Sequence, residues 1–458
     1  MSIASPQAYQ PNQANTNNQT TTAQSNANPN VIQRGDGLQV VVGLGGSGLS
    51  VVNYLTTQGY RVAVTDGGEP KLASALPADV ITRFAGLDAE LLASASRIIM
   101  SPGIDPCLPV FDAARAKNIP MVSDIQLFHE VCAQRQIPIV AITGSNAKST
   151  VTTLVGEMAK DAGLAVGVGG NLGTPALDLL AEPMQLAVLE LSSFQLQTTS
   201  NLSAQVATVL NMSPDHLDRH GTVEVYAQTK ESIGKNQTKD QVMVLNYEDD
   251  TTRAMADRAN GTVLFFSLHH KIKEGVSMEG DAFIIEENGK KQIVCTLDDV
   301  NLLGDHNYEN ILAAIAVTYS MGVPVSYIKE GIKRFKGVEH RIEYVAEKNG
   351  VVYYNDSKGT NPDAAIKGIQ AMNRPTVLIG GGYDKDSAYD EWIDSFDGKV
   401  KKLVLLGATR DKIAETARAH GFEDIEMADT FEEAFAKCVE NAKPGDAVLL
   451  SPACASFD

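Results

Sequence analysis

The chain has 458 residues, of which 43% are hydrophobic, and a formal net charge of -18. This length exceeds one ordinary core, so we expect two or three domains. The acidic balance disfavours binding to nucleic acid or to a membrane surface, and no apolar run is long enough to span a bilayer. The five cysteines are scattered and never spaced Cys-x-x-Cys, which indicates a reducing cytoplasm and neither a disulfide framework nor a structural zinc site.

Residues 1–36 are mostly Asn, Gln, Thr, Ser and Ala, with very few large apolar side chains. Such a segment buries too little surface to offset its chain entropy, so we expect a disordered tail. It lacks the basic start and apolar core of a signal peptide.

A first domain is expected over residues 37–130. The apolar run 38–42 predicts a buried strand, and Gly43-Leu-Gly-Gly-Ser-Gly48 follows it with the G-x-G-x-x-G spacing. The next predicted strand, 61–65, ends at Asp66, so the pattern is the Rossmann fingerprint in a strand–turn–helix setting. It indicates a nucleotide diphosphate, without selecting NAD. A glycine turn that only lets helix and strand pack is the alternative.

A second domain is expected over residues 131–336, beginning with the strand 139–143, a turn and a helix. The turn Gly144-Ser-Asn-Ala-Lys-Ser-Thr150 directs backbone N–H groups and a helix N-terminus at one spot, which favours a polyphosphate. Lys148 would meet the terminal phosphates and Ser149 would hold Mg²⁺. The strict P-loop pattern fails at Ile142 and Ala147, so an ordinary turn is the alternative.

Two further polar positions follow buried strands of this domain. Glu190 ends the apolar run 186–190, where a carboxylate is costly unless it is paired or metal-bound, so we expect a Mg²⁺ ligand. Alternatively, Glu190 caps a neighbouring helix. The run 206–211 leads into Pro214-Asp-His-Leu-Asp-Arg-His220, at the edge of a parallel sheet where ligands bind. His216 is its most plausible functional member, because Asp215 and Asp218 could equally be helix-starting residues; a structural histidine is the alternative.

The segment 281–296 predicts an antiparallel hairpin that turns at Asn288-Gly289. A third α/β domain is expected over 337–458, with Pro362 at a first helical position and a capping box between Thr430 and Glu433. The last predicted strand, 447–450, has no helix after it. We expect either a chain cut short at its C-terminus or a sheet edge left uncovered. The fold class is therefore α/β, with Rossmann-like first and third domains. Between them we expect a P-loop ATPase-like domain whose mostly parallel sheet has a small antiparallel part.

Seven motifs in this order resemble the ATP-dependent Mur ligases of peptidoglycan synthesis. They are T-G-S-N-A-K-S-T, L-E-L-S-S-F-Q-L, D-H-L-D-R-H, G-D-H-N-Y-E-N, E-H-R-I-E, N-D-S-K-G-T-N and S-P-A-C-A-S-F-D. The resemblance covers residues 37–458. Within the family it is greatest to the members that add D-glutamate to UDP-N-acetylmuramoyl-L-alanine (UDP-MurNAc-L-Ala).

The resemblance implies a reaction in two steps. ATP phosphorylates the terminal carboxylate of UDP-MurNAc-L-Ala, and the amine of D-glutamate then displaces phosphate to form an amide. Lys148, Glu190, His216 and Lys230 would be the catalytic residues. Two Mg²⁺ ions are implied, held by Ser149, Glu190, His216 and a carbamylated Lys230.

The resemblance also assigns the substrate contacts. ATP would meet Gly144, Ser145, Asn146, Ala147, Lys148, Ser149, Thr150, Asn310, Arg341 and Asp356, with Asp356 on the ribose. The UDP substrate would meet Gly46, Ser47, Ser101, Asn171 and His216. D-glutamate would meet Lys358, Thr360, Lys385, Ser456 and Phe457, whose two lysines supply the positive charge that its carboxylates require.

Two positions depart from the family pattern. Ala147 stands where the family has glycine, and Gly67-Gly68 replace an expected Thr-Arg pair after Asp66, which predicts a rearranged UDP pocket and not a different substrate. The alternatives are a sister Mur enzyme, a folylpolyglutamate-type ligase, and an NAD-dependent oxidoreductase that would leave the second-domain motifs unused. We expect a cytoplasmic monomer whose partners are small molecules.

Overall fold

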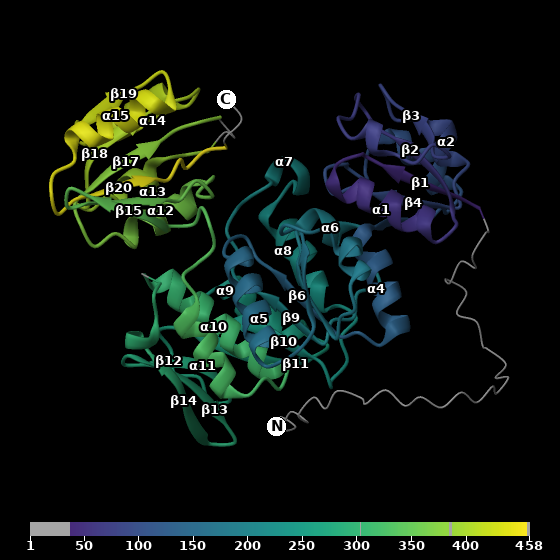
Figure 1. The fold of residues 1–458 in the computed structure, drawn as a ribbon, viewed down its shortest axis with the longest axis horizontal. Coiled ribbons are helices and arrows are strands. Elements are labelled where there is room, and N and C mark those ends of the chain that lie inside the picture. Colours follow the sequence, from purple (N-terminus) through teal and green to yellow (C-terminus); the bar gives the residue numbers. More distant parts are fainter. Residues whose placement is uncertain (1–36, 303, 384–386, 456–458) are drawn as a thin grey trace. The chain divides into compact units, whose positions relative to one another are not determined.

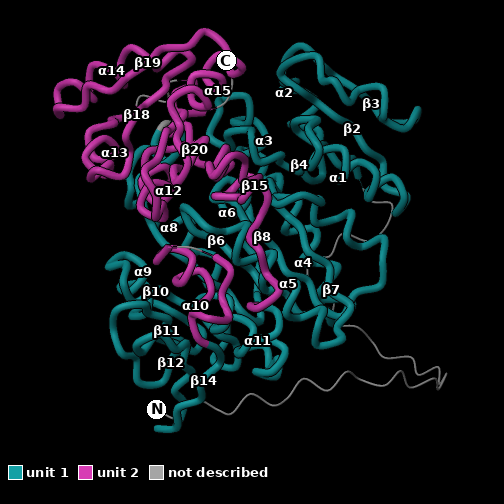
Figure 2. Tube along the Cα trace, turned by 60° about the vertical axis from the view of Figure 1, so that its left-hand side comes forward, with its two compact units in different colours: residues 1–295, 312–331 teal, residues 296–311, 332–458 magenta. Residues whose placement is uncertain are grey.

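The structure is a computed structural model that describes residues 37–302, 304–383 and 387–455. The tail expected over residues 1–36 lies outside the described residues. The chain divides into two compact units, one of residues 1–295 and 312–331 and the other of residues 296–311 and 332–458 (Figure 2). The first expected domain and most of the second share the first unit. Residues 296–311 and 332–336 of the second expected domain, and all of the third, belong to the second unit.

The first sheet is Rossmann-like, as predicted, with five parallel strands in the order β3-β2-β1-β4-β5 (Figure 1). The central strand has a run of valines buried on both faces, as expected where helices cover the two faces of a parallel sheet. The strands are β1 (Leu38–Val42), β2 (Arg61–Thr65), β3 (Ile81–Arg83), β4 (Arg97–Met100) and β5 (Met121–Ser123). The helices are α1 (Gly46–Thr57), α2 (Ala89–Ala93), α3 (Asp112–Ala116) and α4 (Asp124–Arg135).

The second sheet has nine strands in the order β14-β13-β12-β11-β10-β9-β6-β8-β7. It is parallel from β7 to β12. Its strands are β6 (Ile139–Thr143), β7 (Val166–Gly170), β8 (Leu186–Glu190), β9 (Val206–Val209), β10 (Val242–Asn246), β11 (Thr262–Ser267), β12 (Gly275–Glu279), β13 (Ala282–Glu287) and β14 (Lys290–Thr296). Its helices are α5 (Lys148–Asp161), α6 (Ser193–Gln197), α7 (Leu217–His220), α8 (Val223–Glu231), α9 (Asp250–Met255), α10 (Asp305–Ser320) and α11 (Val325–Arg334).

The expected hairpin is confirmed at β13 and β14. Asn288 and Gly289 both have positive φ, 53° and 70°, as a type I′ turn requires. β12 pairs antiparallel with β13, so the antiparallel part lies at one edge of a sheet that is otherwise parallel.

The third sheet has six strands in the order β15-β16-β20-β17-β18-β19, with only β15 antiparallel to its neighbour. The strands are β15 (Glu343–Lys348), β16 (Val351–Asn355), β17 (Thr376–Gly380), β18 (Val400–Leu405), β19 (Ile425–Met427) and β20 (Ala447–Leu450). The helices are α12 (Pro362–Gln370), α13 (Asp390–Asp394), α14 (Arg410–Ala419) and α15 (Phe431–Asn441).

Each face of the third sheet has its own core. Residues of α12, α13 and α14 pack in one cluster, and Ala434 and Cys438 of α15 pack in the other. Pro362 is the first residue of α12, as predicted, and Asn361 caps it. The capping box at Thr430 forms only in half: Thr430 accepts from the N–H of Glu433, but the Glu433 carboxylate accepts from the N–H of Asp429 instead.

The first two sheets are joined by one continuous core. Val41 and Ile99 of the first sheet belong to the same buried cluster as Ala141 and Leu189 of the central sheet. This shared core explains why the two expected domains form a single compact unit. In the part of the chain that the structure describes, no helix is long and apolar enough to cross a membrane.

Candidate active site

The phosphate loop, residues 144–147, joins β6 to α5. Gly144 has a φ of 153°, and Ala147 has the left-handed conformation with φ 67° and ψ -3°. Helix α5 starts at Lys148 without a side-chain cap and with no acidic residue in its first turn. The N–H groups of that turn therefore concentrate partial positive charge at one spot, which suits a phosphate group.

Lys148 places its ammonium group against this loop. Nζ donates hydrogen bonds to the backbone oxygens of Gly144 (3.0 Å) and Ser145 (2.9 Å). The positive charge is therefore held at the loop, next to the first turn of α5. The sequence predicted the strand, turn and helix around Lys148, and the contact of Lys148 with terminal phosphates stays a prediction.

Ser149, Glu190 and Asn171 meet at the ends of neighbouring strands. Ser149 Oγ donates to Glu190 Oε2 (2.7 Å), and Asn171 Nδ2 donates to Glu190 Oε1 (2.7 Å). Glu190 ends β8, which pairs with β6, so the sheet itself brings this carboxylate to the phosphate loop. Only 3% of Glu190 is exposed, and its two hydrogen bonds offset the cost of burying a carboxylate.

These groups fit a magnesium ion. A hydroxyl and a carboxylate are hard oxygen ligands, and Mg²⁺ in nucleotide sites commonly takes one or two protein ligands plus phosphate oxygens and water. Across the described ranges, no group of three or more His, Cys, Asp or Glu side chains is arranged to hold a metal. The ligand set at Ser149 and Glu190 is therefore one that a nucleotide would complete.

Lys230 is buried beneath the same loop, with 1% of its surface exposed. Nζ donates to the backbone oxygen of Gly144 (2.9 Å) and lies 4.7 Å from the centre of the Tyr226 ring. Burial lowers the pKa of Lys230 well below its usual value, and the nearby charge of Lys148 lowers that pKa further. Asp215 and Glu190 oppose this shift.

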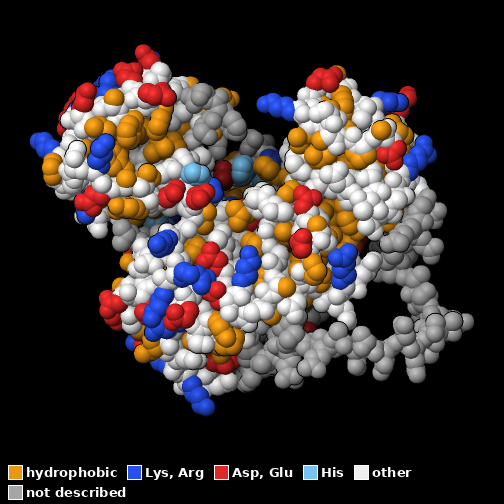
Figure 3. Space-filling model, in the orientation of Figure 1, with side chains coloured by type: hydrophobic (Ala, Val, Ile, Leu, Met, Phe, Trp, Pro, Cys, Tyr) orange, Lys and Arg blue, Asp and Glu red, His pale blue; other side chains and the backbone are white. Residues whose placement is uncertain are grey.

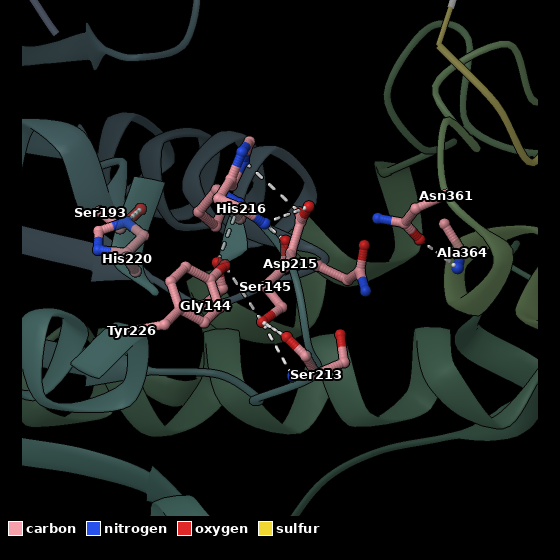
Figure 4. Close-up of polar contacts among 12 residues, drawn as sticks. Gly144, Ser145, Ser193, Ser213, Asp215, His216, His220, Tyr226, Asn361 and Ala364 are labelled. Atoms are coloured by element: carbon pink, nitrogen blue, oxygen red, sulfur yellow. Dashed lines mark hydrogen bonds and ion pairs between the residues drawn. The ribbon is translucent and has the colours of Figure 1, made fainter. Parts of the chain in front are cut away.

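His216 lies immediately before α7, in a cluster of aromatic rings (Figure 4). Its backbone is left-handed, with φ 52°, and its Nε2 lies 3.6 Å from Asp215 Oδ2. The ring contacts Phe194 edge-on at 4.8 Å and lies 6.4 Å from Tyr226. Tyr226 also contacts Lys230, so His216 and Lys230 are gathered around one tyrosine.

The glycine-rich turn of the first sheet has the three glycine roles of the fingerprint. Gly43 has a φ of 88°, Gly45 has open space around it, and a Cβ on Gly48 would lie 2.0 Å from the oxygen of Gly43. Gly46 starts α1, which has no side-chain cap and no acidic residue in its first turn, and Ser47 follows it. Ser101 Oγ donates to the oxygen of Gly43 (2.7 Å) and so braces the turn.

The carboxylate of Asp66 is hydrogen-bonded to the same turn. Oδ2 accepts from the N–H of Leu44 (2.7 Å), and Oδ1 accepts from the N–H of Gly68 (3.0 Å). The chain after β2 therefore folds back onto Asp66 at Gly68, and this carboxylate helps to organise the glycine turn.

In the second unit, Asp356 and Arg341 lie close to one another. Asp356 is 3% exposed, and its oxygens accept from the Ser451 hydroxyl (2.7 Å) and the N–H of Ile342 (3.2 Å). Burial raises its pKa to about 6, against the opposing effects of the Ser451 hydrogen bond and the Arg341 charge. Arg341 Nε is buried without a hydrogen-bond partner in the structure, so this guanidinium has a donor to spare for an anion.

The segment around Arg341 is strained. His340 and Ile342 both have left-handed backbones, with φ of 69° and 46°. A β-branched residue in this region is an outlier, and such strain clusters at functional sites. The N–H of His340 donates to Glu343 Oε2 (2.7 Å), which helps to hold the turn.

The remaining predicted contacts are placed in part. Asn310 is buried on α10 and its Nδ2 donates to Asn307 Oδ1 (3.3 Å). Lys358 and Thr360 follow β16 in the turn before α12, where the N–H of Lys358 donates to the oxygen of His340 (3.0 Å). Lys385, Ser456 and Phe457 lie outside the described residues.

Sequence reasoning missed two residues of the first unit. Asn211 makes side-chain hydrogen bonds to the phosphate loop, and its position just after β9 was the available signal. Arg219 is 9% exposed, stacks on Phe194 and donates to the oxygen of Ile104 (2.8 Å), so it ties α7 to the segment after β4. No pattern in the sequence links Arg219 to Ile104.

A cavity of about 890 Å³ in the first unit lies elsewhere. Its lining includes Ile139, Val242 and Thr262, the first residues of β6, β10 and β11. It therefore opens at the amino ends of these strands, whereas the phosphate loop and Glu190 lie at the carboxyl ends of theirs.

Three protein-family models match the chain. They are the MurD-like N-terminal domain of Mur ligases over residues 38–123, the Mur ligase middle domain over residues 142–318, and the Mur ligase glutamate ligase domain over residues 340–454. These matches follow the order of the three sheets.

Curated relatives match over nearly the whole chain. UDP-N-acetylmuramoylalanine--D-glutamate ligase from Psychrobacter arcticus is 46% identical over 95% of this chain and 94% of its own. The protein of that name from Acinetobacter baylyi is 46% identical over 93% and 95%, and that from Lachnoclostridium phytofermentans is 42% identical over 91% and 93%.

Solved structures share the fold at low identity. UDP-N-acetylmuramate-alanine ligase MurC from Thermotoga maritima has a TM-score of 0.60 at 20% identity and covers 92% of this chain and 96% of its own. MurF from Acinetobacter baumannii has a TM-score of 0.57 at 18% identity, over 90% and 86%. The family models, the near full-length relatives and the fold agree: the chain belongs to the Mur ligase family.

Proposed function

We propose that this protein is an ATP-dependent ligase that joins D-glutamate to UDP-N-acetylmuramoyl-L-alanine in peptidoglycan precursor synthesis. The observation that carries the proposal is the convergence of Lys148, Ser149 and Glu190 at the carboxyl edge of the central sheet. The names of relatives that are 42% to 46% identical support the choice of substrates.

The reaction begins with transfer of the γ-phosphoryl group of ATP to the terminal carboxylate of the UDP substrate, which gives an acyl phosphate and ADP. The amine of D-glutamate then attacks the acyl carbon, the C–O bond to phosphate breaks, and one proton leaves the nitrogen as the amide forms. Catalysis of this kind is mainly positioning and neutralisation of negative charge. Mg²⁺, when bound, supplies positive charge to the phosphate oxygens.

The residues of the first unit have distinct roles in this proposal. Lys148 and the first turn of α5, with Ser145, Asn146, Ala147 and Thr150, bind the phosphates. Ser149 and Glu190 hold one Mg²⁺. His216 holds a second with a modified Lys230 and, with Asn171, contacts the muramoyl-alanine end. Gly46, Ser47 and Ser101 bind the UDP moiety, where the uncapped start of α1 suits a diphosphate.

The residues of the second unit supply further contacts. Asn310, Arg341 and Asp356 bind ATP, with the spare donor of the Arg341 guanidinium directed to an anion. Lys358, Thr360, Lys385, Ser456 and Phe457 bind D-glutamate.

Carbamylation of Lys230 has a physical basis in its lowered pKa. A neutral amine adds CO₂ to give a carbamate and one proton, whereas an ammonium does not react. The charge of Lys148 that opposes a cation at Lys230 would favour the anionic carbamate. NMR of the protein in ¹³C-labelled bicarbonate should show a carbamate resonance that is absent from the Lys230→Arg variant; equal spectra would reject the modification.

Composition supports the cellular setting. All five cysteines are described and are free thiols, in keeping with a reducing cytoplasm. On the face that Figure 3 shows, basic side chains are interspersed with acidic ones, and the 38 basic residues are outnumbered by 56 acidic ones. Small-molecule substrates, and not nucleic acid or a membrane, are therefore the proposed partners, and a monomer is the proposed state.

The decisive experiment measures phosphate release with ATP and UDP-MurNAc-L-Ala, testing D-glutamate against L-alanine, L-lysine and L-glutamate. Release should depend on D-glutamate and should be abolished in Lys148→Ala, which should still bind the UDP substrate. Release that depends on another amino acid would identify a different ligase of this family. Full activity of Lys148→Ala would overturn the phosphate assignment.

A further inference from the structure

The segment that follows β9, residues 210–213, is hydrogen-bonded to the phosphate loop along its length. The N–H of Ser145 donates to the backbone oxygen of Asn211 (3.0 Å). Ser145 Oγ donates to the oxygen of Ser213 and accepts from the N–H of Ser213, both at 3.0 Å. Figure 4 shows Ser145 between Ser213 and Tyr226.

The side chain of Asn211 contacts the loop from both sides of Asn146. Its Oδ1 accepts from the N–H of Asn146 (2.8 Å), and its Nδ2 donates to the oxygen of Asn146 (3.4 Å). The first bond fixes the orientation of the amide, since a backbone N–H requires the oxygen. The second holds the peptide group between Asn146 and Ala147, whose orientation is set by the ψ of Asn146 and the φ of Ala147.

Hydrogen bonds from neighbouring elements hold the residues on both sides of Asn211. Asn246 Nδ2 donates to the oxygen of Leu210 (3.1 Å), and the N–H of Met212 donates to Asp249 Oδ2 (2.6 Å). Asp249 also caps α9 through the N–H of Thr252 (2.9 Å). The residues on either side of Asn211 are therefore anchored to β10 and α9, so the Asn211 amide acts from a rigid support.

This support has a specific task at Ala147. A left-handed backbone costs an alanine roughly 1–2 kcal/mol that a glycine avoids. Without a hydrogen bond from outside the loop, the φ and ψ angles of Ala147 would relax toward the right-handed helical region. The N–H groups at the start of α5 would then turn away from the spot that Lys148 and Ser149 share.

We propose that Asn211 is a positioning residue that holds the phosphate loop in its strained, ATP-binding conformation through the peptide groups around Asn146. The inference rests on the proposed function, since ATP is the ligand that the loop would bind. It assigns Asn211 no contact with substrate. Asn211 acts through the backbone of Asn146 and Ala147.

The test is a double-mutant cycle of Asn211→Ala with Ala147→Gly. Two constants are measured for each variant: the KM for ATP and, by calorimetry, the dissociation constant for ADP. Asn211→Ala should raise both constants by roughly tenfold, the factor that corresponds to about one hydrogen bond. The KM for D-glutamate should stay within about twofold. Because glycine adopts positive φ without strain, adding Ala147→Gly should recover part of the loss.

Asn246→Ala is the matched control. It removes one hydrogen bond to the same segment, from Leu210, but contacts no residue of the phosphate loop. It should lower the melting temperature about as much as Asn211→Ala does. It removes only one of the two anchors of the segment, since Met212 still donates to Asp249, so it should weaken ADP affinity clearly less than Asn211→Ala does. Asn211→Asp keeps the acceptor for the N–H of Asn146 but loses the donor, so its ADP affinity should be as weak as that of Asn211→Ala.

Equal effects of Asn211→Ala and Asn246→Ala on ADP affinity, or strictly additive effects of Asn211→Ala and Ala147→Gly, would overturn the inference. A failure of the proposed function would look different. The wild-type protein would then release no phosphate with D-glutamate. The ADP dissociation constants of the four proteins in the cycle would still show whether Asn211 positions the loop.

Discussion

Ala147 has a backbone conformation that L-residues other than glycine adopt at a cost. The change Ala147→Gly removes about 1–2 kcal/mol of left-handed strain and adds back about 0.5–1 kcal/mol of chain entropy on folding. We expect a net gain in unfolding free energy of roughly 0–1.5 kcal/mol, measured by urea denaturation. Ala147→Val should instead lose about 2 kcal/mol or more, because a β-branched residue is poorly tolerated at positive φ and the side chain is 7% exposed. A valine variant as stable as the wild type would contradict the strain.

Asp356 gives the second unit a pH-dependent stability. Its folded pKa, about 6, lies above the ordinary value of 3.8, so the folded state favours the protonated form. The stabilisation of the folded state by the protonated Asp356 carboxyl is therefore fully present below pH 3.8 and is lost as the pH rises through about 6. Asp356→Asn, which stays neutral, should gain up to about 3 kcal/mol of stability at neutral pH and little near pH 4. Urea unfolding at the two pH values measures this difference, and a gain that did not depend on pH would contradict it.

The same substitution separates stability from activity. If Asp356 contacts the ribose as proposed, Asp356→Asn should be more stable and weaker in ATP binding. A residue kept at a cost in stability is typical of functional positions. Unchanged ATP affinity would leave Asp356 with a structural role only.

The site could be predicted from sequence to the extent that its residues follow strand ends. Glu190 was predicted because a carboxylate that ends an apolar strand is costly unless it is paired or metal-bound, and Ser149 was predicted from the turn that precedes its helix. Their contact distance required the pairing of β6 with β8, which no local pattern encodes. The burial of Lys230 was invisible, since Gly144, whose oxygen accepts from it, lies 86 residues away on another element. Tyr226, its other contact, is one turn earlier on α8. The family resemblance alone singled out Lys230.

At the scale of elements, His420 links two helices of the second unit. It follows α14, and its ring nitrogens contact Asp394 (2.6 Å) and Asp390 (3.1 Å) of α13. Hydrogen bonds donated to these two carboxylates raise the pKa of His420 above 6.5. The stabilisation by protonated His420 is therefore complete below pH 6.5 and is lost as the pH rises through the folded pKa.

The expected outcome is a loss of stability in His420→Ala that is present at about pH 6 and fades toward about pH 9. The difference between wild-type and variant urea midpoints measures it at each pH. Because both carboxylates are well exposed, the effect should weaken in high salt. A difference that grew with pH would reject the charged interaction.

Most elements were predictable because their patterns are local. Buried strands read as valine-rich runs, and the hairpin turn at Asn288-Gly289 has the residues that its positive φ values require. The prediction of a capping box at Thr430 was only half right. The Glu433 carboxylate accepts from the N–H of Asp429 and not from that of Thr430, and this depends on the backbone path just before α15.

At the scale of the molecule, the two units have separate cores and should report separate unfolding transitions. Trp392, the only tryptophan, is fully buried in the core of the second unit. We expect tryptophan fluorescence to follow the unfolding of that unit alone, while far-UV circular dichroism follows both. ADP with Mg²⁺ should shift the dichroism transition of the first unit, which contains the phosphate loop. Coincident transitions by both probes would contradict independent units.

The division into units was only partly readable in the sequence. The three sheets follow three blocks of alternating strands and helices, and that alternation is a sequence property. The fusion of the first two sheets depends on Val41, Ile99, Ala141 and Leu189 packing into one cluster. Each of these residues is apolar and is therefore predicted to be buried, but the sequence does not indicate which other residues it packs against.

The left-handed Ala147 also bears on how such a loop changes in evolution. Its cost of about 1–2 kcal/mol is a modest fraction of the 5–15 kcal/mol by which folded proteins are stable. Selection tolerates a loss of that size while the total stays above its threshold, so glycine and alanine can exchange by near-neutral drift. Anchors such as Asn211 conserve the shape of the loop while its sequence varies. A search that demands glycine before the lysine would therefore overlook functional loops whose geometry is intact.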